Sequence, residues 1–278
     1  MASNAPNALW YVYGIVPSAN AGTSAPAGLD DTSVALEVHD DVAALVSVLQ
    51  GDDYAPAHLE TRSGDIEWLS PRAVAHDRVL TWASDRGAVI PLPMFSMFSG
   101  REAVQSMLRE RGAQVASVLS RIGAAREYAL RMYRVEAELS IAVEELSPRL
   151  RELAAIARDA TPGQRYLLDR KLDAEKKAEM RLVSQRIADE IVAALAPHAR
   201  PDGVVRSLIP RVTAGDPSAE RGTMVLNAAF LVEPNAIEEF QKTLTTLVAR
   251  HTPNGFRFDF TGPWPPYHFV SERNDDAR

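Results

Sequence analysis

The chain has 278 residues, of which 46% are hydrophobic and 24% charged, with no cysteine and a formal net charge of −7. These values are typical of a globular protein, and the missing cysteines exclude disulfide frameworks, zinc–thiolate sites and cysteine nucleophiles. The negative charge disfavours nucleic acid as a partner, because an acidic surface repels phosphate.

The length favours two domains. The location of the protein is predicted from its N-terminal residues and its apolar runs. Residues 1–8 lack the basic segment and the apolar core of a secretory signal. No apolar run approaches the ~20 residues that span a bilayer. We therefore expect a cytoplasmic protein without membrane contact.

The chain begins with predicted strands. Residues 8–16 are rich in β-branched and aromatic side chains and predict a strand that stops at Pro17. Residues 17–31 have little to bury and predict a flexible loop. Residues 34–49 predict a hairpin that turns at His39, although residues 42–49 also suit a short helix.

A helix and a short strand follow. Ser70 and Pro71 match an N-cap and a first helical position, so a helix is predicted from there to about residue 86. Residues 88–92 then predict a short buried strand.

A second helix is predicted to connect the two halves. Ser99 and Glu102 have the spacing of a capping box, and the helical pattern behind them ends at Gly123. We place the domain boundary near Ile122, which gives an N-terminal domain at 1–122 and a C-terminal domain at 123–278.

The second half begins with a predicted strand at 127–134 and two short helices, the second capped by Ser147. Thr161 and Gln164 form a capping box that opens a helix of some 34 residues, about 50 Å long. Its apolar side is predicted to consist of Leu168, Leu172, Leu182, Ile187, Ile191 and Leu195.

The remaining elements complete a recognisable order. Strands are predicted at 204–210 and 223–232, then a helix capped by Asn235, then a strand at 255–261. The second half thus reads βαββαβ, the order of a ferredoxin-like unit, with an extended tail. The first half resembles a shortened relative whose first crossover helix is replaced by loop. The fold class is α+β.

Four stretches resemble the F/L family of gas vesicle proteins, in that family's order and spacing. The last of them, with its GPWPPY run, is the most specific. The stretches are Tyr11–Val16, His76–Leu80 with Val89–Leu92, Gly163–Leu167 and Thr261–Val270. One departure is clear: the arginine-phenylalanine-glycine run that many members have after the central proline is absent after Pro91.

The resemblance implies a two-domain, cytoplasmic accessory or minor structural protein of the gas vesicle. It implies contact with the small hydrophobic shell protein, and with other accessory proteins, during assembly. It brings no catalytic activity and no cofactor.

The residues themselves predict no catalytic or metal site. The six histidines lack metal-ligand spacing, and no phosphate-binding or nucleophile motif is present. His76 fits a partly buried helix histidine. Gly14, which is isolated in a strand, fits a bulge or a close backbone approach.

The candidate partner-binding residues are aromatic side chains and methionines in two segments. One set follows the last strand, where prolines stiffen the chain, and the other follows the central short strand. Each set either packs onto the protein's own body or stays exposed to bind a partner. The candidates are Trp264, Tyr267, Phe269, Met94, Phe95, Met97 and Phe98.

The leading hypothesis is a non-enzymatic assembly factor that covers an aggregation-prone shell subunit. An alternative in the same biology is a minor component retained in the finished shell. A third, from another class, is a small-molecule sensor or enzyme on a ferredoxin-like scaffold, which a deep pocket with convergent polar groups would favour.

Overall fold

The structure is a computed structural model that describes residues 8–20, 24–50, 52–62, 64–209 and 221–270. It forms two compact units, Met1–Glu127 with Pro263–Arg278, and Tyr128–Gly262. The division after Glu127 lies near the one expected at Ile122. The C-terminal residues, however, group with the first unit, whereas the sequence had placed them in the second.

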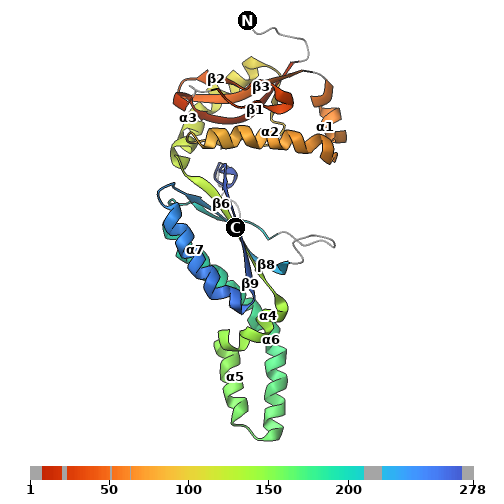
Figure 1. The fold of residues 1–278 in the computed structure, drawn as a ribbon, viewed down its shortest axis with the longest axis vertical. Coiled ribbons are helices and arrows are strands. Elements are labelled where there is room, and N and C mark those ends of the chain that lie inside the picture. Colours follow the sequence, from red (N-terminus) through yellow and green to blue (C-terminus); the bar gives the residue numbers. More distant parts are fainter. Residues whose placement is uncertain (1–7, 21–23, 51, 63, 210–220, 271–278) are drawn as a thin grey trace. The chain divides into compact units, whose positions relative to one another are not determined.

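The first unit is built on an antiparallel sheet (Figure 1). Strand β1 (Ala8–Pro17) lies between β3 (Val42–Gln50) and the short strands β4 (Ile90–Pro91) and β5 (Met97–Phe98). Strand β2 (Ala35–His39) pairs with β3 at the edge. The predicted hairpin is thus confirmed, and residues 42–49 are a strand rather than a helix.

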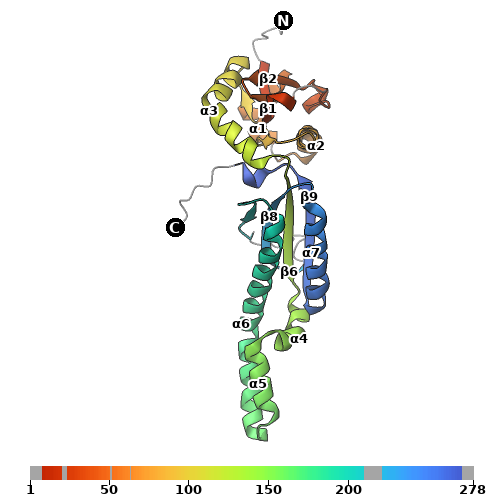
Figure 2. The ribbon, with the colours of Figure 1, turned by 90° about the vertical axis from the view of Figure 1, so that its left-hand side faces the viewer.

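Helices cover both faces of this sheet (Figure 2). Tyr11 and Tyr13 of β1 pack with helix α2 (Ile66–Ser84), whereas Val12 packs with helix α3 (Arg101–Ile122). A bulge between Val12 and Gly14 shifts the alternation. The sheet therefore has an apolar cluster on each face.

The helix starts of this unit differ from the predicted ones. A short helix, α1 (Pro56–Arg62), had not been predicted. Helix α2 is capped by Asp65, whose carboxylate accepts hydrogen bonds from the N–H groups of Glu67 and Trp68. Pro71 lies inside that helix, at an exposed position where the carbonyl it leaves unbonded can face water. The predicted start at Ser70 was wrong.

The predicted capping box at Ser99 and Glu102 was also wrong. Helix α3 is capped by Gly100, which has no side chain to accept a hydrogen bond. Its end at Gly123 is as predicted.

The loop after β1 buries more than its composition indicated. Leu29 is fully buried in a 3-10 turn (Leu29–Asp31), and its N–H donates a hydrogen bond to Tyr13 Oη at 2.8 Å. The prediction of little to bury was therefore wrong for this end of the loop, and residues 21–23 lie outside the described ranges.

The second unit has a sheet in the order β7-β8-β6-β9. Strands β6 (Arg126–Arg134) and β8 (Thr223–Val232) are central, and β7 (Val204–Arg206) and β9 (Phe256–Trp264) are the edges. The predicted strand order along the chain is confirmed, together with the α+β class. Residues 210–220, between β7 and β8, lie outside the described residues.

Its helices are α4 (Glu136–Leu146), α5 (Pro148–Arg158), α6 (Pro162–Leu195) and α7 (Ile237–His251). The second half of α6 and α7 contribute to one core with the sheet, while α5 packs against α6 as a helical hairpin (Figure 1). The predicted caps of α5 and α6 are confirmed. The predicted cap of α7 at Asn235 was wrong, because Ala236 occupies that position.

The apolar side of α6 was only partly predicted. Ile187, Ile191 and Leu195 are buried as expected, but Leu182 is 62% exposed. Its neighbours Met180 and Val183 point to the core instead, since they continue the i, i+4 series back from Ile187.

Candidate functional site

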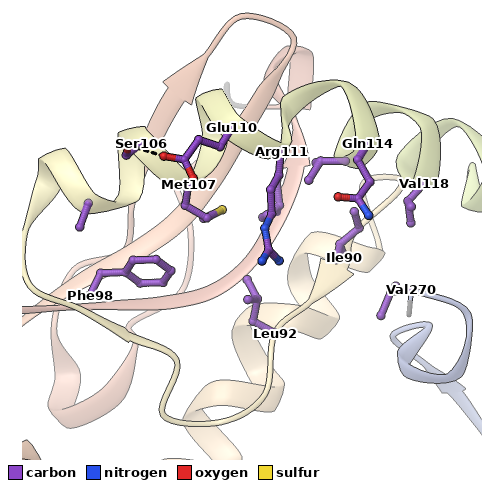
Figure 3. A pocket seen from close by; sticks show the side chains of 13 residues that line it. Ile90, Leu92, Phe98, Ser106, Met107, Glu110, Arg111, Gln114, Val118 and Val270 are labelled. Carbon is purple, nitrogen blue, oxygen red and sulfur yellow. Dashed lines mark hydrogen bonds between the residues drawn. The ribbon is translucent and has the colours of Figure 1, made fainter. Parts of the chain in front are cut away.

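The first unit carries an apolar groove of about 630 Å³ between α3 and the strands β1, β4 and β5, which we call the α3 groove (Figure 3). Its floor belongs to the apolar cluster under α3. The apolar lining residues are Ile15, Ile90, Leu92, Phe98, Ala103, Met107, Val115, Val118 and Val270.

Polar side chains line the groove from α3 alone. Ser106, Glu110, Arg111 and Gln114 follow one another over its turns. The Ser106 hydroxyl donates a hydrogen bond to Glu110 Oε1 at 2.9 Å. Arg111 points into the middle of the groove, toward Leu92 (Figure 3). Among the residues that the structure describes, its guanidinium has neither an ion pair nor a hydrogen bond.

The C-terminal segment, residues 263–270, begins with the last two residues of β9 and belongs to the first unit. Trp264 and Tyr267 are 42% and 41% exposed, whereas Phe269 is buried. The carbonyl of Phe269 accepts a hydrogen bond from Arg121 of α3 at 2.9 Å. Of the predicted candidates in this segment, the first two are accessible and the third is a packing residue.

A buried hydrogen-bonded chain leads from Tyr267 into the sheet. Tyr267 Oη lies 3.4 Å from His76 Nε2, and His76 Nδ1 lies 2.6 Å from Tyr11 Oη. The Phe95 N–H donates to Tyr11 Oη at 3.4 Å, which leaves the Tyr11 hydroxyl to donate to Nδ1. We infer that the imidazole proton is on Nε2, facing Tyr267.

Burial determines the charge state of these hydrogen-bonded side chains. It lowers the pKa of His76 to about 4, and a hydrogen bond with the Leu92 backbone opposes this effect only in part. It also raises the pKa of Tyr267 to about 12, together with the charges of Asp77 and Glu127. The three hydrogen-bonded side chains are therefore neutral at pH 7, and His76 is a buried residue of helix α2.

A buried carboxylate holds the next residue of the C-terminal segment. Glu127 is only 3% exposed and accepts hydrogen bonds from the backbone N–H of His268 at 2.9 Å and from its Nδ1 at 2.7 Å. This hydrogen bond raises the pKa of the His268 imidazole. The exposed rings of Trp264 and Tyr267 are thus carried on a fixed backbone.

The predicted candidates between β4 and α3 go to different places. Phe95 stacks on Trp68 at a centroid distance of 5.6 Å and has a positive φ of 65°. Met97 packs against the core on the α2 face of the sheet, and Met94 is half-buried. Of the four candidates, Phe98 alone lines the α3 groove, beside Val270 of the C-terminal segment.

Sequence reasoning missed the groove residues of α3. Met107, Arg111 and Val118 lie on the side of this helix that faces the groove, next to the buried stripe that the periodicity predicted. Ala103 and Met107 are apolar and four residues apart, which could have indicated this side of the helix. Apolar residues at that spacing, however, more often pack into the core.

No catalytic or metal arrangement is found among the described residues. No group of three histidine, aspartate or glutamate side chains there could hold a metal ion. The polar side chains of the groove come from one helix and do not converge on a point. None of the helices in the described ranges has the length and hydropathy that crossing a membrane requires.

Comparison with known proteins gives matches over nearly the whole chain. A family model described as "Gas vesicle synthesis protein GvpL/GvpF" matches residues 9–271. Gas vesicle protein L of Streptomyces sp. (strain CB03234) is 27% identical over 246 residues, which cover 86% of this chain and 84% of that protein. Gas vesicle protein F of the same strain is 27% identical over 266 residues, with coverages of 94% and 98%.

Solved structures agree with these matches at the level of the fold. The crystal structure of the gas vesicle protein GvpF from Anabaena sp. PCC7120 has a TM-score of 0.63 to this chain and 17% identity, and covers 96% of this chain and 97% of its own. GvpF from Microcystis aeruginosa also gives 0.63, at 18% identity, with coverages of 95% and 99%.

Proposed function

Because this chain belongs to the GvpL/GvpF family of gas vesicle synthesis proteins, which indicates a role in gas vesicle formation, we propose that it is a non-catalytic assembly protein that binds the hydrophobic shell protein. It acts in the cytoplasm, at the growing vesicle, beside other accessory proteins. A shell subunit exposes apolar surface before it polymerises, and that surface aggregates unless it is covered.

One observation carries the proposal: the exposed rings of Trp264 and Tyr267 are held on a backbone anchored by Arg121 and Glu127. Aromatic side chains at low conformational entropy are favoured anchors at interface centres. The net charge of −7 supports the role, because it keeps a complex with an apolar partner in solution.

We also assign the second unit to a ferredoxin-like layout and the first unit to a shortened one, with the domain boundary at the end of α3, near residue 122. In that layout the first and third strands are central and the second and fourth are edges. The order β7-β8-β6-β9 agrees, and so does β2-β3-β1-β4 in the first unit. The residues described between β1 and β2 form short 3-10 turns and no α-helix, which supports a shortened first crossover in this unit.

The test is a pull-down of the major vesicle shell protein from the same organism, co-expressed with the tagged protein. The proposal predicts specific recovery with wild type and loss with a folded Trp264→Ala/Tyr267→Ala double variant. Tyr166→Ala is a matched control, since Tyr166 is 62% exposed and lies on α6 of the other unit. Failure of the wild type to recover the shell protein would contradict direct binding.

A second experiment, the analysis of washed, intact vesicles, separates transient from permanent association. An assembly factor is absent from washed, intact vesicles. Its presence there at fixed stoichiometry would instead make it a minor structural component of the shell.

A further inference from the structure

The α3 groove has the anatomy of a peptide-binding site. Its floor is apolar, and its polar side chains all come from α3, with Arg111 reaching over the floor. Interfaces between proteins are likewise enriched in methionine, aromatic residues and arginine. From Ala103 to Val118 the groove follows α3 for about four turns, roughly 22 Å. That length suits an elongated partner.

Arg111 gives this groove a charge preference. Its guanidinium lies over the apolar floor and has no anionic partner among the described residues, whereas the nearby Glu110 already accepts a hydrogen bond from Ser106. A cation beside an apolar floor attracts a carboxylate attached to an apolar body. A charge-assisted, bidentate hydrogen bond is the contact that arginine makes best with that group.

We propose that the α3 groove docks an amphipathic, apolar helix of a partner protein, with an acidic side chain of that helix paired to Arg111. Apolar side chains one turn apart fill the floor over Met107, Phe98 and Val118, in the manner of helix-in-groove recognition. The kind of partner rests on the proposed function, in which a hydrophobic protein is covered. The groove and its charge preference do not depend on it.

The groove also connects this partner to the C-terminal segment. Val270 lines one end of the groove, six residues beyond Trp264. A helix that fills the groove therefore contacts this segment at Val270, whereas Tyr267 is directed to His76 of α2, on the other face of the sheet.

The experiment uses two synthetic 18-residue peptides, with leucine at helical spacing on one face and either one glutamate or one glutamine beside it. Binding to the full-length protein is measured by fluorescence anisotropy. Wild type is expected to bind the glutamate peptide about three- to fivefold more tightly than its glutamine twin, the size of a partly exposed ion pair. Added salt should reduce this difference.

Three variants locate the contact. Arg111→Met should bind both peptides equally, because it keeps the aliphatic stem and removes the charge. Arg109→Met is the matched control, an exposed arginine of α3 that does not line the groove, and it should keep the difference. Met107→Glu should weaken both peptides about tenfold or more, because it places a charge on the apolar floor. Circular dichroism checks that each variant is folded.

Several results would overturn the proposal. Equal binding of the two peptides by wild type would remove the charge preference, and an equal loss in Arg109→Met would move it elsewhere. Displacement of the peptide by dodecanoate at lower concentration would assign the groove to a small amphiphile. A wild-type dimer that Met107→Glu converts to a monomer would assign it to a second copy of the chain.

The outcomes for groove and function are separable. If shell protein is recovered equally by wild type and Arg111→Met, the function stands and the groove is not its site. If the peptides distinguish Arg111 but the shell protein is not recovered, the groove stands and the proposed partner is wrong.

Discussion

At the scale of single residues, Gly14 shows how the absence of a side chain at one position allows the first unit to pack. It follows the bulge in β1, where a Cβ would lie 2.7 Å from the carbonyl oxygen of Ile90 and 2.9 Å from Leu80 Cδ2. A glycine there lets β4 and α2 approach the strand. The sequence predicted the bulge or close approach, and the structure has both.

We therefore predict that Gly14→Ala lowers the free energy of unfolding by about 1–3 kcal/mol, because a side chain must be forced into a filled core. Urea denaturation measures the change. Gly112→Ala is the control: nothing lies within 4 Å of a Cβ there, and alanine favours the helix. A loss for Gly112→Ala equal to that for Gly14→Ala would contradict this explanation.

His76 makes the first unit sensitive to acid. Its pKa is lowered to about 4 in the folded state, so the unfolded chain binds a proton first as the pH falls. Stability is present above about pH 6.5 and is lost toward pH 4, by up to about 3 kcal/mol. In His76→Gln, which keeps a donor and an acceptor but cannot titrate, the urea midpoint should change less between pH 7 and pH 4.5. Equal changes in both proteins would refute the prediction.

The contribution of His268 to stability has the opposite dependence on pH. Its pKa is raised by the hydrogen bond to Glu127, so its contribution to stability is present below about pH 6.5 and is lost as the pH rises through the higher folded value. The imidazole is half exposed, so solvent screens the effect. A histidine titration followed by NMR should show the raised pKa in wild type and its return toward 6.5 in Glu127→Gln. An unchanged titration in that variant would show that Glu127 is not the cause.

At the scale of elements, the caps decide where the helices of the second unit begin. Ser147 is fully buried, and its hydroxyl accepts a hydrogen bond from the Leu150 N–H and donates one to Glu179 at 2.6 Å. One side chain thus both caps α5 and connects it to α6. This contact holds the start of α5 against α6 within the helical hairpin.

We predict that Ser147→Ala costs about 1–3 kcal/mol in unfolding free energy, since it leaves a buried N–H and a carboxylate without this partner. Thermal and urea unfolding both report the loss. Ser99→Ala should change stability by less than about 0.5 kcal/mol, because Ser99 is exposed and Gly100 occupies the cap of α3. Equal effects of the two substitutions would contradict this assignment of the caps.

These caps also show what sequence can and cannot predict. The patterns at Ser147 and Thr161 predicted helix starts correctly, because proline at the next position and the following apolar spacing agreed with the cap. At Ser70 a proline after serine predicted a start that proved to lie inside a helix. Asp65 caps that helix instead, because its carboxylate accepts hydrogen bonds from the N–H groups of Glu67 and Trp68.

The candidate site was harder to predict than the elements. Aromatic residues in the C-terminal segment could be named from sequence, but their exposure depends on contacts over long sequence distances, such as Glu127 with His268. Arg111 could not be distinguished from an ordinary surface arginine. Its position over an apolar floor exists only when α3 lies against β1 and β4.

At the scale of the whole molecule, an acidic α+β protein carries two accessible apolar features on its first unit, the exposed rings and the α3 groove. Both suit a protein that covers a partner's apolar surface and releases it. The second unit provides a helical hairpin whose exposed residues include Tyr166 and Leu167. This gives the matched surface that binding experiments need as a control.

The most direct test of this account is protection of the shell protein from aggregation. Denatured shell protein is diluted into buffer with the purified wild-type protein, and the amount that stays in the supernatant after centrifugation is measured. The account predicts that the shell protein remains in solution, in complex, at stoichiometric protein concentrations, and that the Trp264→Ala/Tyr267→Ala variant protects less. If the shell protein sediments as completely with wild type as it does with serum albumin, the central claim is wrong.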